Sequence, residues 1–182
     1  QFLGNACLNV VEVSLVVGLT QHMPVVMTGI VFLLFYARFR LMAKGPLFVF
    51  GANGVLTLSV LMHFASYPTL DLADLLASNL VASVLAVIIA AVMYWVFPDV
   101  EPRARPSAVE KSASLVRHQT LIGAITATLS FVVFQTLDLR DSLSAQMATI
   151  LSLFSLGYHG ARVSAVKRAI GTFLCCNLAI IL

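Results

Sequence analysis

One acidic residue, Glu12, lies well inside a long apolar segment at the start of the chain. In a helix, Asn5, Asn9 and Glu12 follow the spacing i, i+4 and i+7, which places all three side chains on one face. A charge at the centre of a bilayer costs about 2.5–3.5 kcal/mol on insertion scales, so such residues usually face a helix bundle or a water-filled cavity. The sequence offers no evident basic partner for Glu12.

This polar face has two interpretations. It predicts either the lining of a substrate or proton path, with Glu12 as a protonatable switch, or a hydrogen-bond ladder that joins two helices. Asn53 lies between Gly51 and Gly54 in a second apolar segment and has a similar pair of interpretations. The glycines either unwind the helix, so that Asn53 lines the path, or allow close helix packing, which we expect.

The remaining reactive side chains predict no catalytic site. The four histidines, His63 included, fall at or near the ends of apolar segments, and none has a second ligand at metal-binding spacing. The chain shows no nucleophile triad, carboxylate dyad or phosphate-binding glycine loop. We therefore expect no metal, no cofactor and no enzymatic activity, with energy supplied by an ion gradient or another subunit.

The composition sets the class of protein. Of 182 residues, 60% are apolar and only 10% are charged, against about 25% in a typical soluble domain. The three cysteines do not fit a secreted disulfide scaffold, and the net charge of +3 is too small for a nucleic-acid binder. Because a spanning helix needs about 20 residues, the sequence predicts an all-α, polytopic transmembrane helical bundle of about six or seven spans.

The apolar segments divide into two groups. Residues 1–97 predict a first group of four transmembrane helices, and residues 119–182 predict a second group whose last span begins near Ala169. Between them, residues 98–118 form a polar, proline-rich linker. The final span is too short to cross a bilayer, so we expect a piece of a longer protein. The expected spans cover residues 2–19, 24–36, 46–61, 75–97, 121–137, 143–158 and 169 onward.

Lysines and arginines predict the orientation. Every one except Arg140 falls in three connections that lie on one side if the helices alternate. The positive-inside rule places that side, including the linker, in the cytoplasm. Five of these cations are expected to act as cytoplasmic anchors between spans: Arg38, Arg40, Arg162, Lys167 and Arg168. The segments that end at Arg38 and Arg162 are also similar to each other: in each, an alanine precedes the arginine, and a lysine and a further apolar run follow it. This similarity suggests parallel repeats.

Residues 117–182 resemble a known family. A basic residue opens a span, an acidic turn follows, and Arg168-Ala169-Ile170-Gly171-Thr172 enters a further span. This order is similar to the fusaric acid resistance family of bacterial inner-membrane efflux proteins, which includes aromatic carboxylic acid exporters. Residues 1–97 resemble a related bacterial branch of unassigned function. Cys175 replaces a glycine of the family pattern, but Gly171 and Cys175 still form a small-residue face.

The resemblance implies a secondary, proton-motive-force-driven efflux transporter subunit for small aromatic or organic acids or similar amphiphiles. It implies partnership with a periplasmic adaptor protein, and it implies that Gly171 and Thr172 serve helix packing. We expect the lipid bilayer and further copies of the chain as partners, and no nucleic acid. The alternative is a non-transporting membrane scaffold or anchor subunit of a larger complex.

Overall fold

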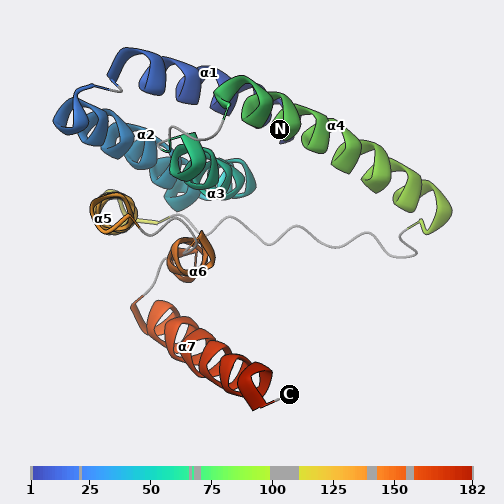
Figure 1. Cartoon of the computed structure of the whole chain (residues 1–182). Coiled ribbons are helices and arrows are strands. Elements are labelled where there is room, and N and C mark those ends of the chain that lie inside the picture. Colours follow the sequence, from blue (N-terminus) through green and yellow to red (C-terminus); the bar gives the residue numbers. More distant parts are fainter. Residues whose placement is uncertain are drawn as a thin grey trace.

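The protein is an all-α bundle, as the sequence predicts (Figure 1). The computed structural model describes residues 2–20, 22–65, 67, 71–98, 111–138, 143–154 and 158–181. Seven α-helices lie within these ranges: α1 (Phe2–Thr20), α2 (Pro24–Lys44), α3 (Phe48–Ala65), α4 (Leu72–Val96), α5 (Ala113–Thr136), α6 (Leu143–Leu153) and α7 (Tyr158–Ile181).

Five of the described helices, α1 to α5, are long and apolar enough to cross a membrane. The protein is therefore a multi-pass membrane protein. Helix α6 has 11 residues, which at about 1.5 Å per residue is too short for a hydrocarbon core of about 30 Å. The predicted sixth span, residues 143–158, is thus shorter in the structure. Helix α7 begins at Tyr158, before the predicted start of the seventh span at Ala169, and it is not among the five candidate spans of the described residues.

Local sequence signals explain several helix ends. Pro24 begins α2, where its missing N–H leaves no intrahelical acceptor unsatisfied. Gly45 caps the end of α2 with φ of 93°, a conformation that favours glycine. The Asp71 side chain caps α4 by accepting a 2.8 Å hydrogen bond from the backbone N–H of Ala73. Ser112 similarly caps α5.

Helix α2 lies at the centre of the bundle, where it packs most extensively on α5 and α3. Helix α1 crosses α3 and α4, and α6 rests on α3 and α5. The largest fully buried apolar side chains come from the facing sides of α2, α3, α5 and α6: Phe35, Phe39, Met42, Leu58, Met62, Phe131 and Ile150. These contacts join helices from both predicted groups into one core.

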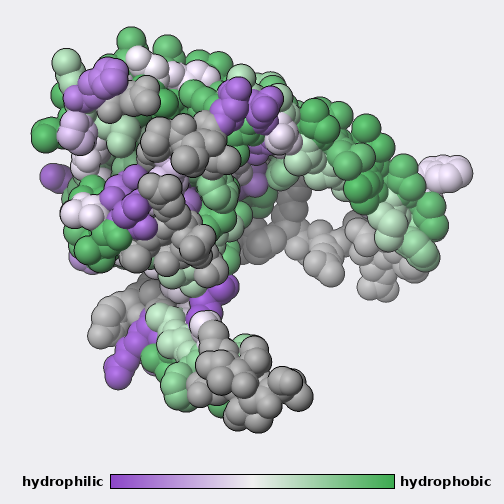
Figure 2. Space-filling model, in the orientation of Figure 1, coloured by the Kyte–Doolittle hydropathy of each residue, from purple (hydrophilic) through white to green (hydrophobic). Residues whose placement is uncertain are grey.

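Two helices extend beyond this core. In Figure 1, α4 projects from the bundle and α7 leads away from it to the C-terminal end. Figure 2 shows a continuous hydrophobic surface over the projecting part of α4. Trp95 near the end of α4 is 84% exposed, as expected for an aromatic side chain at a membrane interface.

The predicted division into residues 1–97, 98–118 and 119–182 stays a prediction, and residues 99–110 of the linker lie outside the described residues. The parallel repeat stays a prediction as well. The structure adds that α5, which follows the linker, packs against α2.

Candidate functional site

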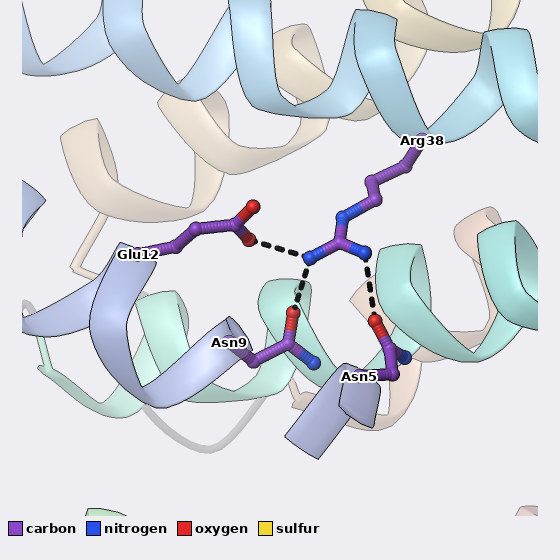
Figure 3. Close-up of polar contacts among 4 residues, drawn as sticks. All are labelled: Asn5, Asn9, Glu12 and Arg38. Carbon is purple, nitrogen blue, oxygen red and sulfur yellow. Dashed lines mark hydrogen bonds and ion pairs between the residues drawn. The ribbon is translucent and has the colours of Figure 1, made fainter. Parts of the chain in front are cut away.

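The polar face of α1 meets an arginine from α2. The Arg38 guanidinium donates hydrogen bonds from Nη1 to Oδ1 of Asn5 at 2.7 Å and from Nη2 to Oδ1 of Asn9 at 3.0 Å. The same Nη2 forms an ion pair with Oε2 of Glu12 at 2.7 Å. Figure 3 shows the three α1 side chains converging on one guanidinium. The prediction that Asn5, Asn9 and Glu12 share a face is confirmed, and these four residues are the candidate site.

Arg38 reaches this position because α2 is longer than predicted. The helix continues to Lys44, so Arg38 lies within it and not in a loop after a span that ends at residue 36. Its side chain lies on the buried face of α2, in the series Val31, Phe35, Arg38 and Met42. Arg38 is only 2% exposed. The predicted position of Arg38 between two spans is therefore wrong: it lies inside α2, with its charge directed toward α1.

A glycine and an aromatic ring complete the pocket around the guanidinium. A Cβ at Gly54 would lie 3.0 Å from Cδ of Arg38 and 3.0 Å from Oδ1 of Asn5. Glycine at this position therefore lets α3 approach the cluster. The Phe50 ring of α3 lies 5.3 Å from Cζ of Arg38, which adds a cation–π contact on an otherwise apolar side. Since α3 is continuous through Gly51 and Gly54, the packing interpretation of these glycines is confirmed.

The charges in this site are nearly removed from solvent. Asn5 and Asn9 are fully buried, whereas the Glu12 side chain is 16% exposed. A buried cation and anion each carry a desolvation penalty of several kcal/mol, which close pairing and further hydrogen bonds offset. The interpretation that Glu12 lacks a basic partner is wrong, because Arg38 is that partner.

Two hydrogen-bond donors remain unused in the site. The Nδ2 atoms of Asn5 and Asn9 are buried and have no hydrogen-bond partner among the described residues. A buried donor without an acceptor costs about 1–3 kcal/mol. The site therefore combines a carboxylate with a guanidinium and two unused amide donors, and the guanidinium and the amides are groups that can bind an oxygen anion.

The other predicted site residues lie apart from this cluster. Asn53 is half-buried on α3 and makes none of the cluster's hydrogen bonds. Arg40 is exposed near the end of α2. Arg162, Lys167 and Arg168 are exposed along α7, and their role as cytoplasmic anchors stays a prediction. Gly171 and Thr172 are also exposed, and no atom comes within 4 Å of a Cβ built at Gly171, so their packing role stays a prediction.

A second buried polar contact was missed by the sequence analysis. Nε2 of Gln146 on α6 donates a 2.8 Å hydrogen bond to Oγ of Ser59 on α3, and both residues are fully buried. One helical turn further along α3, His63 is also fully buried and makes edge-to-face contacts with Phe64 and Tyr67. His63 lies in the last turn of α3, near the end of its apolar segment as predicted, and its side chain is buried within the bundle.

A cavity of about 430 Å³ lies between the second half of α2 and the first half of α5. Four basic side chains line it: Arg40, Lys44, Lys111 and Arg117. Two of the basic segments predicted to share the cytoplasmic side thus lie next to each other. The described residues contain no group of three or more His, Cys, Asp or Glu side chains that could hold a metal ion.

Comparisons with known proteins place the chain in a family. The family described as "Protein of unknown function (DUF2955)" matches residues 1–93, which contain all four residues of the candidate site. No curated protein and no solved structure matches the chain. The matched segment covers half of the sequence, from α1 through most of α4. The chain therefore belongs to the DUF2955 family, a protein family of unknown function.

Proposed function

We propose that this chain is a subunit of a proton-motive-force-driven efflux transporter in a bacterial inner membrane. The observation that carries the proposal is the Glu12–Arg38 ion pair between two membrane-spanning helices. Ionisable residues within membrane spans are rare and commonly mark proton or substrate pathways. The pair lies beside two buried asparagines whose amide donors are unused.

The geometry provides a way to couple a proton to a change in the contact between α1 and α2. When Glu12 is ionised, its carboxylate neutralises Arg38 at 2.7 Å. A proton on Glu12 removes that negative charge and leaves a buried, uncompensated guanidinium, which is strongly unfavourable. Loss of this ion pair loosens the contact between α1 and α2, so a proton that enters from the outer side can drive the conformational change that exports the substrate. The Glu12 side chain is 16% exposed and that of Arg38 only 3%, so Glu12 is the more accessible of the two charges.

The proposed substrate class is small aromatic or organic acids and similar amphiphiles. Its support is the resemblance of residues 117–182 to the fusaric acid resistance family, together with an anion-binding set of groups at the site. The same resemblance supports a periplasmic adaptor as a partner, and we propose further copies of the chain as partners as well. The cavity that gathers Arg40, Lys44, Lys111 and Arg117 supports a cytoplasmic position for that end of the bundle. The proposed activity is transport and not catalysis.

Transport by the reconstituted full-length protein tests this proposal. Efflux of radiolabelled benzoate from proteoliposomes would be measured under an imposed pH gradient, with Glu12→Gln compared with wild type. Asp74→Asn is the matched control, since Asp74 is an exposed acid in the first turn of α4. The proposal predicts that Glu12→Gln loses acceleration by the gradient while Asp74→Asn keeps it. Equal gradient-driven efflux by Glu12→Gln and wild type at equal protein content would contradict the coupling role.

A scaffold or anchor subunit is the second candidate function. It is favoured by the hydrogen-bond ladder itself, which occupies the Glu12 carboxylate and ties α1 to α2. The cavity between α2 and α5 is not lined by Glu12. A scaffold needs only the folded pair of helices α1 and α2. The double variant Glu12→Leu with Arg38→Met would therefore still bind the partner complex in a pull-down. Transport would be lost in the same double variant if the first proposal is correct.

A further inference from the structure

The cavity between α2 and α5 is a concave surface lined by four basic side chains. Arg40 and Lys44 come from the last turns of α2, and Lys111 and Arg117 come from the start of α5. None of the described residues that line the cavity is acidic. These four cations therefore repel one another, and an anion in the cavity would relieve that repulsion.

We propose that this cavity binds the phosphate of an anionic phospholipid headgroup. Its volume of about 430 Å³ lies within the usual range of small-ligand sites. Basic pockets between transmembrane helices on the cytoplasmic side are suited to such headgroups. Tyr36 and Thr120 also line the cavity and carry hydroxyl groups.

The polar lining is arranged to receive an anion. The Nζ of Lys111 donates a 3.3 Å hydrogen bond to Oε1 of Gln119, which keeps this cation near the N-terminal end of α5. The backbone N–H groups of the first turn of α5 begin at Ala113, another lining residue, and the positive end of the helix dipole adds to the field there. Three of the cations, Arg40, Lys44 and Arg117, keep exposed surface, so a ligand can enter from outside the bundle.

The surface below the cavity distinguishes a lipid from a soluble phosphate. Leu33 and Val26 lie on the same face of α2 as Tyr36 and Arg40, by helical spacing, and they are 62% and 47% exposed. Leu33 lies about 10 Å along the helix from Arg40, toward the interior of the predicted bilayer. A phospholipid whose phosphate occupies the cavity would lay its acyl chains along this apolar face. A free phosphate would leave the face uncovered.

Native mass spectrometry of the purified chain tests the site. The protein in detergent would be mixed with equal amounts of phosphatidylglycerol and phosphatidylcholine, and retained lipid would be counted. Wild type should retain phosphatidylglycerol preferentially, and Arg40→Gln combined with Lys44→Gln should reduce that preference about 10- to 30-fold. The control pair Arg162→Gln and Arg168→Gln removes the same charge from exposed positions on α7 and should change nothing.

Two further arms make the outcome decisive. The charge-keeping swap Arg40→Lys with Lys44→Arg should retain phosphatidylglycerol, which separates charge from a folding defect. Millimolar inorganic phosphate should not displace the lipid from wild type. Equal loss in the α7 control would show unspecific charge attraction and overturn the proposal. Displacement by inorganic phosphate, or equal retention of glycerol phosphate and phosphatidylglycerol, would identify a free-anion site and overturn the lipid assignment.

Discussion

Nη2 of Arg38 lies 2.7 Å from Oε2 of Glu12, and this ion pair joins α2 to α1 inside the membrane-spanning part of the protein. The pair is 26 residues apart in sequence and is completed by Asn5 and Asn9. Its two charges are unequally protected, since Glu12 keeps some exposed surface and Arg38 keeps almost none. Because replacing one residue leaves the other charge unpaired, a single variant should lose more stability than a variant in which both residues are replaced.

The ion pair gives the first stability prediction. Arg38→Met leaves Glu12 partly buried without its cation, and the free energy of unfolding should fall by about 3–5 kcal/mol. The double variant with Glu12→Leu should recover most of that loss, because neither charge then remains to be desolvated. Unfolding in mixed micelles, followed by circular dichroism, measures both variants. A double variant as unstable as the sum of the two single variants would show that the residues do not interact.

Gly54 gives a second prediction that probes the same site from α3. In Gly54→Ala the new Cβ would lie 3.0 Å from both Arg38 Cδ and Asn5 Oδ1, so one of them must move. We expect a loss of about 1–3 kcal/mol in the free energy of unfolding. Gly18→Ala on α1 is the control, because its Cβ would meet nothing within 4 Å and alanine favours the helix. A stabilised Gly54→Ala protein would contradict the described approach of α3.

Gly123 predicts how closely α5 packs on α2. A Cβ at Gly123 would lie 2.5 Å from the Phe39 ring, and that ring is fully buried and has little room to shift. Gly123→Ala should therefore destabilise the protein by about 1–3 kcal/mol. Adding Phe39→Leu should restore part of the loss by shortening the opposing side chain. If Gly123→Ala unfolds at the same denaturant concentration as wild type, the packing of α5 on α2 is looser than described.

The Ser59–Gln146 contact predicts how α6 is held. Ser59→Ala removes the hydroxyl that accepts a 2.8 Å hydrogen bond from the buried amide of Gln146. The free energy of unfolding should fall by about 1–2 kcal/mol. Hydrogen exchange of α6 measures this loss locally, and exchange should accelerate there more than in α1. Thr28→Ala is a suitable control, since the Thr28 hydroxyl bonds only to the carbonyl of Pro24 in its own helix. Faster exchange in both variants alike would argue against a specific role for Ser59.

Helical periodicity explains what the sequence could predict. In a helix, polar residues at i, i+4 and i+7 of an apolar segment must lie on one face, and the structure places Asn5, Asn9 and Glu12 together. The same reasoning predicted an all-α membrane protein, because long apolar segments must satisfy their backbone hydrogen bonds internally. The partner of Glu12 could not be deduced this way, because the spacing within α1 carries no information about α2.

Arg38 was assigned to a loop because an apolar run ends just before it, at residue 36. Two signals indicated the longer helix. Gly45-Pro46 is a strong helix stop, which places the end of the helix after Arg38. Arg38 also continues the apolar series of Val31 and Phe35 at helical spacing, so that it shares their buried face. Gln146 could not be found at all, since its partner Ser59 is 87 residues away.

In the proposed function, a proton on Glu12 replaces the ion pair that Glu12 forms with Arg38. Infrared difference spectroscopy of the reconstituted protein between neutral and acidic pH tests this most directly, by the carboxylic acid C=O band that appears on protonation. We expect one component of this band to be present in wild type and in Asp74→Asn and to be missing in Glu12→Gln. The guanidinium bands of wild type should change over the same pH range, and this change should be absent in Arg38→Lys. Identical difference spectra for wild type and Glu12→Gln would contradict it.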